Sequence, residues 1–430
     1  MALFEGVKLA AVAAGMAITI SCNTVLVSLF PHAPGRALFT ALALAGLCMA
    51  VVVLCFAELA SRFPGAIGIR AFTKAAFGNR FSLAVTLFYV AMVMLIGGLE
   101  VYLCHLMLAR VLPGAAGGAV LAMLLAAIVW VNLAGHELSL RLQVAMTLAV
   151  AVTMLTLAWL ALHNAAATPL PIVAAGAGGS LLEAVPRALF LFIGIEWAVM
   201  HVGRHAAFRR TLPLAMIGSV VAIALLYGTF GAALQARFGP GTLGSMALPH
   251  LELARALNAP GAIWLATAVG LLAVLSSFNV GLSGAARILY SLARERELPA
   301  WFAQLHGPRL VPRNAMLFIS CGVLVMAPLM ALPALAESLS MLFSFHLAMV
   351  YACVLLAWLR MRRRPDGRGV HQPLHPLLVW PVLAFLATTG IGVMAEPQAA
   401  AARMILLGEC LAIGAISAYL FRSALVHTEG

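Results

Sequence analysis

The sequence predicts an all-α polytopic membrane protein. Hydrophobic residues make up 64% of the 430 residues and charged residues only 9%, whereas a soluble globular chain is about 25% charged. The apolar residues gather in runs of about 20, the length that a helix needs to cross a bilayer. The formal charge of +12 does not indicate binding to nucleic acid, because the basic residues lie in short segments between apolar runs without interleaved aromatic residues.

About twelve helices are expected to cross the membrane as a single transmembrane domain. They are predicted over 7–30, 37–59, 81–107, 117–134, 141–163, 181–202, 211–234, 260–285, 314–331, 336–359, 376–395 and 403–421. The first run is long enough to span and is expected to be a retained helix. All seven cysteines fall inside apolar runs, which favours free, buried thiols over a disulfide framework.

The Lys and Arg residues predict the orientation of the chain. Most of the 26 basic residues follow even-numbered spans, as Arg62, Arg70, Lys74 and Arg80 do after the second. Because basic loops stay in the cytoplasm, we expect both termini there, in a multi-pass protein of the cell inner membrane. The run Arg360–Arg364 is expected to end the tenth span at the cytoplasmic surface, within reach of anionic membrane lipid.

Two spans depart from uniform apolarity. Near its middle the first span carries Thr19, Ser21, Cys22, Asn23 and Thr24. The sixth carries Gly194 and Glu196 inside the run Phe190–Trp197. Glycine permits backbone conformations that a regular helix does not use, and an ionised carboxylate at bilayer depth normally faces a cavity or a partner. A glycine-interrupted helix with a charge at the break is typical of a transport site near the bilayer midplane.

The spacing of the two interruptions predicts an internal repeat. They hold corresponding positions in two five-helix halves, which is the sequence trace of a five-plus-five inverted repeat. The first repeat is predicted over 7–163 and the second over 181–359, with two additional helices over 376–421. The two broken helices would meet at one shared site. The alternative for Ser21–Thr24 is an ordinary polar contact between helices.

Three stretches resemble the amino acid–polyamine–organocation transporters. The first is Glu58–Gly68 (ELASRFPGAIG) followed by Ala76–Gly78 (AFG). The second is Phe192–Glu196 (FIGIE) with Arg209–Pro213 (RRTLP) downstream. The third joins Ser277–Asn279 (SFN), Ala286–Pro299 (ARILYSLARERELP) and Val311–Ala315 (VPRNA). The resemblance covers nearly the whole chain and is most specific in the third stretch.

The resemblance implies first and sixth helices that are unwound at the substrate. It also implies secondary transport of an amino acid or related amine by alternating access, through proton symport or exchange. In similar proteins that exchange arginine and agmatine, the residue matching Glu196 acts near the inner gate and the one matching Phe190 closes over the substrate. The chain departs from the family at Ser21-Cys22-Asn23, where a glycine run usually lies, and has no lysine in its fifth span.

The candidate substrate-binding residues lie in or near the interrupted spans and in the third and eighth spans: Ser21, Cys22, Asn23, Thr24, Glu100, Phe190, Gly194, Ile195, Glu196, Trp197 and Asn279. Glu196 is either a gate, proton carrier or counter-charge, or a structural carboxylate that accepts from unwound backbone. Glu100 either pairs with an amine or relays a proton, or lies at a water-exposed rim. Asn279 either lines the substrate path or bonds to another helix. Phe190 and Trp197 either stack on a substrate amine or pack between helices.

Further candidates and exclusions complete the prediction. His105, His201 and His346 are either proton-coupling groups or satisfied structural donors. No catalytic, cofactor or metal site is expected, since neither a nucleophile–base pair nor a metal-ligand spacing occurs. The alternative function is a transporter-like ligand sensor without net transport.

Overall fold

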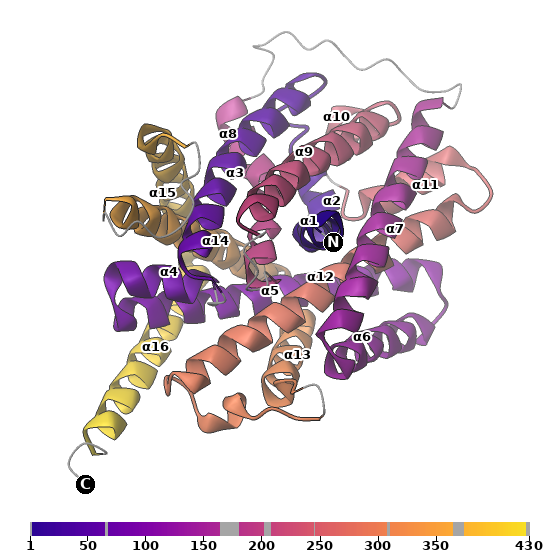
Figure 1. Cartoon of the computed structure of the whole chain (residues 1–430). Coiled ribbons are helices and arrows are strands. Elements are labelled where there is room, and N and C mark those ends of the chain that lie inside the picture. The colour runs from indigo at the N-terminus through magenta and orange to yellow at the C-terminus, as the bar shows by residue number, and fades with distance from the viewer. Residues whose placement is uncertain are drawn as a thin grey trace. The chain divides into compact units, whose positions relative to one another are not determined.

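The computed structural model of the protein describes residues 2–64, 68–163, 180–201, 208–244, 246–307, 310–363 and 374–426. These residues form helices joined by turns (Figure 1), and one isolated β-bridge joins His306 and Val311. By length and composition, nine helices in the described part can cross a membrane, and a bent pair of helices makes up to ten. The prediction of an all-α polytopic membrane protein is confirmed.

The nine long helices are α3 (Ala37–Arg62), α5 (Asn79–Val111), α6 (Ala116–Ala134), α7 (His136–His163), α9 (Phe208–Gln235), α12 (Ala262–Arg294), α14 (Pro333–Arg362), α15 (Val379–Ala395) and α16 (Ala400–Val426). The bent pair is α1 (Ala2–Ala17) and α2 (Ile20–Val27). The shorter helices are α4 (Gly68–Phe77), α8 (Leu181–Phe190), α10 (Pro240–Leu243), α11 (Pro249–Leu257) and α13 (Arg313–Leu329). Four 3₁₀ segments are η1 (Ile195–His201), η2 (Ala300–Ala303), η3 (Pro376–Leu378) and η4 (Pro397–Ala399).

Two predicted spans differ from the long helices. The predicted span 181–202 is divided between α8 and η1, and the predicted span 314–331 corresponds to α13, which has 17 residues. The total of about twelve spans therefore stays a prediction. All seven cysteines are free, but the prediction that all are buried is wrong for Cys321 and Cys410, which are exposed. Both lie on helices, and a helix face that meets lipid needs no protein cover.

The chain forms two compact units. One comprises Met1–Val53 and Glu100–Gly281, and the other comprises Leu54–Leu99 and Leu282–Gly430. The limits of these units fall inside α3, α5 and α12. They do not follow the predicted repeats over 7–163 and 181–359, but a repeat is a symmetry relation whereas a compact unit is a group of mutual contacts. The inverted repeat stays a prediction.

In the first unit α1 lies against α7 and α9 (Figure 1). Small residues permit the close approach. Ala13 and Ala17 are fully buried, and a Cβ atom on Gly15 would lie 2.1 Å from the Gln143 amide nitrogen of α7. A larger residue at position 15 would displace the Gln143 side chain or push α1 away from α7. The position of the broken first helix is thus set by tight contact with its neighbours.

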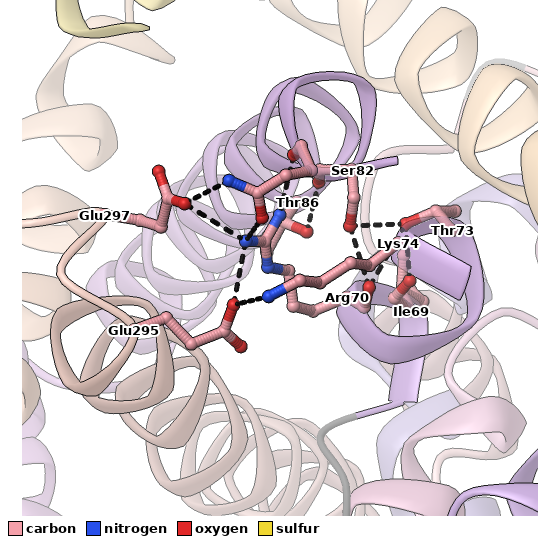
Figure 2. Close-up of polar contacts among 9 residues, drawn as sticks. Ile69, Arg70, Thr73, Lys74, Ser82, Thr86, Glu295 and Glu297 are labelled. Carbon is pink, nitrogen blue, oxygen red and sulfur yellow. Dashed lines mark hydrogen bonds and ion pairs between the residues drawn. The ribbon is translucent and has the colours of Figure 1, made fainter. Parts of the chain in front are cut away.

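In the second unit α14 packs against α4, α15 and α16. Figure 2 shows an ion-pair cluster between α4 and the end of α12, in which the Arg70 guanidinium lies 2.8 Å from the Glu295 carboxylate and 3.7 Å from that of Glu297. Lys74 adds a contact of 2.6 Å with Glu295. Burial raises the pKa of Glu295, but the hydrogen bonds from Lys74 and Arg70 outweigh it and hold the pKa below its ordinary value.

A second buried charge group involves the end of α3 and the end of α14. The Arg62 guanidinium lies 3.4 Å from the Glu58 carboxylate and donates to the Met361 carbonyl at 2.8 Å. Arg362 lies 3.6 Å from the other Glu58 oxygen. These contacts join the end of α3 to the end of α14.

Candidate functional site

The first break separates α1 from α2. The two helices are bent by 57° relative to each other. Thr19 has extended backbone (φ −116°, ψ 165°), and its hydroxyl accepts a hydrogen bond from the Cys22 amide at 3.3 Å. Threonine is a favoured N-cap residue because its hydroxyl accepts a hydrogen bond from a backbone amide that has no partner within the helix. Ser21, Cys22 and Asn23 are buried and Thr24 is half-buried, so the predicted polar cluster does start a new helix.

Glu100 of α5 holds the amino end of α2. Its two carboxylate oxygens accept hydrogen bonds from the Ile20 amide at 2.9 Å and from the Ser21 amide at 3.1 Å. The side chain is only 3% exposed, so the interpretation as a water-exposed rim residue is wrong. An anion at a helix amino end is favourable, because the open amides and the helix dipole both attract it.

The second break lies between α8 and η1. Gly194 has a φ of +103°, which side-chain-bearing residues rarely adopt. A Cβ atom there would lie 2.6 Å from Met16 Cγ and 3.0 Å from the Met16 carbonyl carbon. Glycine is therefore required twice, once for the backbone angle and once for the approach of η1 to α1. The two breaks meet at this point.

Glu196 is the second residue of η1. One of its carboxylate oxygens accepts a hydrogen bond from the Gly194 amide at 2.9 Å, and the side chain is buried. Ile195 and Trp197 are buried as well, and Phe190 at the end of α8 is half-buried. Because η1 packs against α1, Ile195, Glu196 and Trp197 lie on a segment beside that helix.

Asn279 lies in a different group of side chains. Its amide oxygen accepts from Asn132 at 2.8 Å and from Ser139 at 2.9 Å, while its amide nitrogen donates to Gln143 at 2.9 Å. These bonds join α12 to α6 and α7, as expected for the interhelical interpretation of Asn279.

The same group reaches the first helix. Gln143 donates to Ser276 at 2.7 Å, Ser276 donates to the Gly15 carbonyl at 3.0 Å, and Thr147 donates to the Ala11 carbonyl at 2.9 Å. Sequence reasoning missed the part played by Gln143 and Thr147. Their spacing of four residues on one helix, next to Ser139, was the available signal.

Three histidines were candidates for proton coupling. His105 is exposed. His346 of α14 lies 2.9 Å from Glu409 of α16 and against the ring of Phe88, in the unit that does not contain the two breaks. The side chain of His201 lies outside the described residues. No group of three or more metal-ligating residues occurs among the residues that the structure describes.

Near α2, the short helix α11 adds a neutral side chain. The Thr24 hydroxyl donates to the Ala247 carbonyl at 2.9 Å just before α11. His250 on α11 is fully buried beside Met107, and this burial lowers its pKa to about 4. His250 therefore contributes no positive charge at neutral pH.

Two broken helices that meet beside buried carboxylates, within a polytopic helical frame, define a class of protein. This is the architecture of membrane transporters that bind their substrates where interrupted helices meet. The family model described as amino acid permease matches residues 4–411. The chain belongs to this family, which confirms the resemblance to the amino acid–polyamine–organocation transporters.

Curated relatives are similar over about half of the chain. An uncharacterized amino acid permease, YtnA, of Bacillus subtilis is 26% identical over 54% of this chain and 51% of its own length. The aromatic amino acid transport protein AroP of Corynebacterium glutamicum is 26% identical over 46% of this chain and 45% of its own. The cationic amino acid transporter 6 of Arabidopsis thaliana is 27% identical over 42% of this chain and 29% of its own length. The chain thus spans about half the length, or less, of the curated relatives that it matches.

Proposed function

We propose that the protein is a secondary active transporter of an amino acid or a related amine. Substrate would bind where the two breaks meet, and alternating access would carry it across the cell inner membrane by proton symport or by exchange. The contact of Gly194 with Met16, flanked by Glu100 and Glu196, is the observation that carries the proposal. The names of the similar proteins, which include aromatic and cationic amino acid transporters, support it.

The proposed site lies between two helix ends of opposite polarity. The carbonyl end of α1 attracts positive charge, and the amide end of α2 attracts negative charge. Glu196 is proposed to act as gate, proton carrier or counter-charge, while Phe190 and Trp197 would close over the substrate. The distribution of basic residues supports cytoplasmic termini.

Counterflow in proteoliposomes tests the proposal. Vesicles loaded with one unlabelled amino acid or amine at a time should accumulate the labelled compound in at least one case. Glu196→Gln should reduce the initial rate by at least about tenfold, or remove its pH dependence, because an amide carries neither the proton nor the charge. Glu183→Gln is the matched control, since Glu183 is an exposed acid on α8 and should leave the rate unchanged.

Two outcomes would count against this account. Saturable binding without counterflow of any compound would favour the sensor. A Glu196→Gln protein with the rate and pH profile of the wild type would remove Glu196 from the mechanism while leaving transport itself in place.

A further inference from the structure

We infer that the preferred substrate carries an amino group but no carboxylate: a primary amine or polyamine of the kind that decarboxylation of an amino acid produces. The inference rests on the proposed function and narrows its substrate class. Its basis is that the carboxylate of Glu100 already occupies the amide groups that a substrate carboxylate would need.

The hydrogen bonds of Glu100 use the open amino end of the first break. The Ile20 amide donates to one carboxylate oxygen and the Ser21 amide to the other, and the next amide, Cys22, donates to the Thr19 hydroxyl. An intramembrane helix end that binds a substrate carboxylate does so through these first amides. Here all three have partners within the chain. Both oxygens of Glu100 act as acceptors, so each of these two amides is engaged by the same side chain.

A substrate carboxylate would therefore meet two obstacles. It would find these three amides engaged, and it would stand beside the negative charge of Glu100 in a buried place where like charges repel strongly. The broken helix is thus prepared for a ligand without an anionic group. The chain supplies the anion that an amino acid would otherwise bring.

Other groups near the break suit an ammonium. The Asn23 amide oxygen is buried, on a residue only 1% exposed, and finds no hydrogen-bond donor among the described residues. An unsatisfied buried acceptor is unusual and indicates a missing donor, which an amine N–H would supply. Glu196 adds a second buried carboxylate at the adjoining break.

Among the residues that the structure describes, two basic groups near the first break do not place a positive charge beside Glu100. Lys8, the basic residue of α1, precedes the end of that helix at Ala17 by nine residues, which is about 13 Å along the axis. His250 on α11 is neutral at neutral pH. A cationic ligand would balance the Glu100 carboxylate, since buried ions are normally paired.

Binding to matched pairs tests the inference without any substitution. The purified full-length protein is titrated with lysine and cadaverine, arginine and agmatine, ornithine and putrescine, and phenylalanine and phenethylamine, with thermal stabilisation as the readout. We expect at least one amine to bind at least tenfold more tightly than its parent amino acid. Equal or tighter binding of the amino acid in every pair, or binding of neither member of any pair, would overturn the inference.

A substitution locates the preference at Glu100. Glu100→Gln removes the charge and turns an NH₂ group toward one of the two amides, so that end of α2 loses its anion. The ratio of amine to amino acid affinity should fall at least tenfold. Glu337→Gln, at an exposed acid on α14, is the control and should keep the wild-type ratio. An unchanged ratio in Glu100→Gln would overturn the assignment to Glu100.

Failure of the inference and failure of the proposed function give different results. Counterflow of amino acids without counterflow of their amines would contradict the inference but agree with the proposed transport function. Absence of counterflow for every compound would contradict the proposed function itself.

Discussion

Single residues set the geometry of the two breaks, and Gly194 shows this most clearly. Its φ of +103° lies in a region that L side chains avoid, and Met16 fills the space where a Cβ atom would be. A glycine inside an apolar run is conspicuous in a sequence. The structure explains why glycine is needed there: η1 approaches the end of α1, so that Gly194 contacts Met16, a residue far away in the chain.

Gly194→Ala should therefore weaken the folded protein. Left-handed backbone costs an alanine about 1–2 kcal/mol, and the overlap with Met16 adds to this, so the apparent unfolding temperature should fall clearly. Gly218→Ala is the matched control. Gly218 lies inside α9 with no atom within 4 Å of the added Cβ, and in a helix interior alanine is favoured by about 0.5–1 kcal/mol.

Thermal unfolding of both variants in detergent measures the difference. If Gly194→Ala unfolds at the same temperature as Gly218→Ala, then the close contact between η1 and α1 is not part of the stable structure.

At the scale of elements, ion pairs join segments that are far apart in the sequence. The third resembling stretch contains Glu295 and Glu297. Both carboxylates lie near Arg70 of α4, which falls between the two parts of the first stretch (Figure 2). The spacing within each stretch places these groups at the ends of their elements. In the sequence, Glu295 and Glu297 are only part of a motif. The ion-pair cluster shows that their carboxylates contact Arg70.

A double-mutant cycle tests the strength of this link. Arg70 is nearly buried, at 2% exposed, whereas the Glu295 side chain is 29% exposed. We therefore expect a coupling energy of about 2 kcal/mol between Arg70→Met and Glu295→Gln, below that of a fully buried pair. For Lys74→Met and Glu295→Gln we expect less than about 1 kcal/mol, because Lys74 is 44% exposed.

Unfolding in mixed detergent micelles gives the four free energies that each cycle needs. A coupling for Arg70 no larger than that for Lys74 would contradict the idea that the buried guanidinium holds α4 to the end of α12.

For the whole molecule, the features that could be predicted are those that a short stretch of sequence determines by itself. Apolar runs predicted an all-α membrane protein, and both breaks lie where polar residues or glycine interrupt such a run: Thr19 begins the new helix α2, and Gly194 separates α8 from η1. The count of about twelve spans exceeds the helices that qualify by length in the described part, because α8, η1 and α13 are short.

The partners of the site could not be predicted in the same way. Glu100 is 80 residues from Ile20, and no local pattern announces that its carboxylate caps α2. Ser276 and Gln143 are likewise 133 residues apart. Such pairs follow from tertiary packing, to which a single sequence gives no direct signal. The sequence left the role of Glu100 open, and the structure reveals its hydrogen bonds.

The most direct test of the account is a density map of the full-length protein with a bound amine, compared with the ligand-free protein. The account predicts ligand density where the two breaks meet, with its amino group near Asn23 and Glu196 and with Glu100 still on the Ile20 and Ser21 amides. Ligand density away from the breaks, or a ligand carboxylate that displaces Glu100 from those amides, would contradict it.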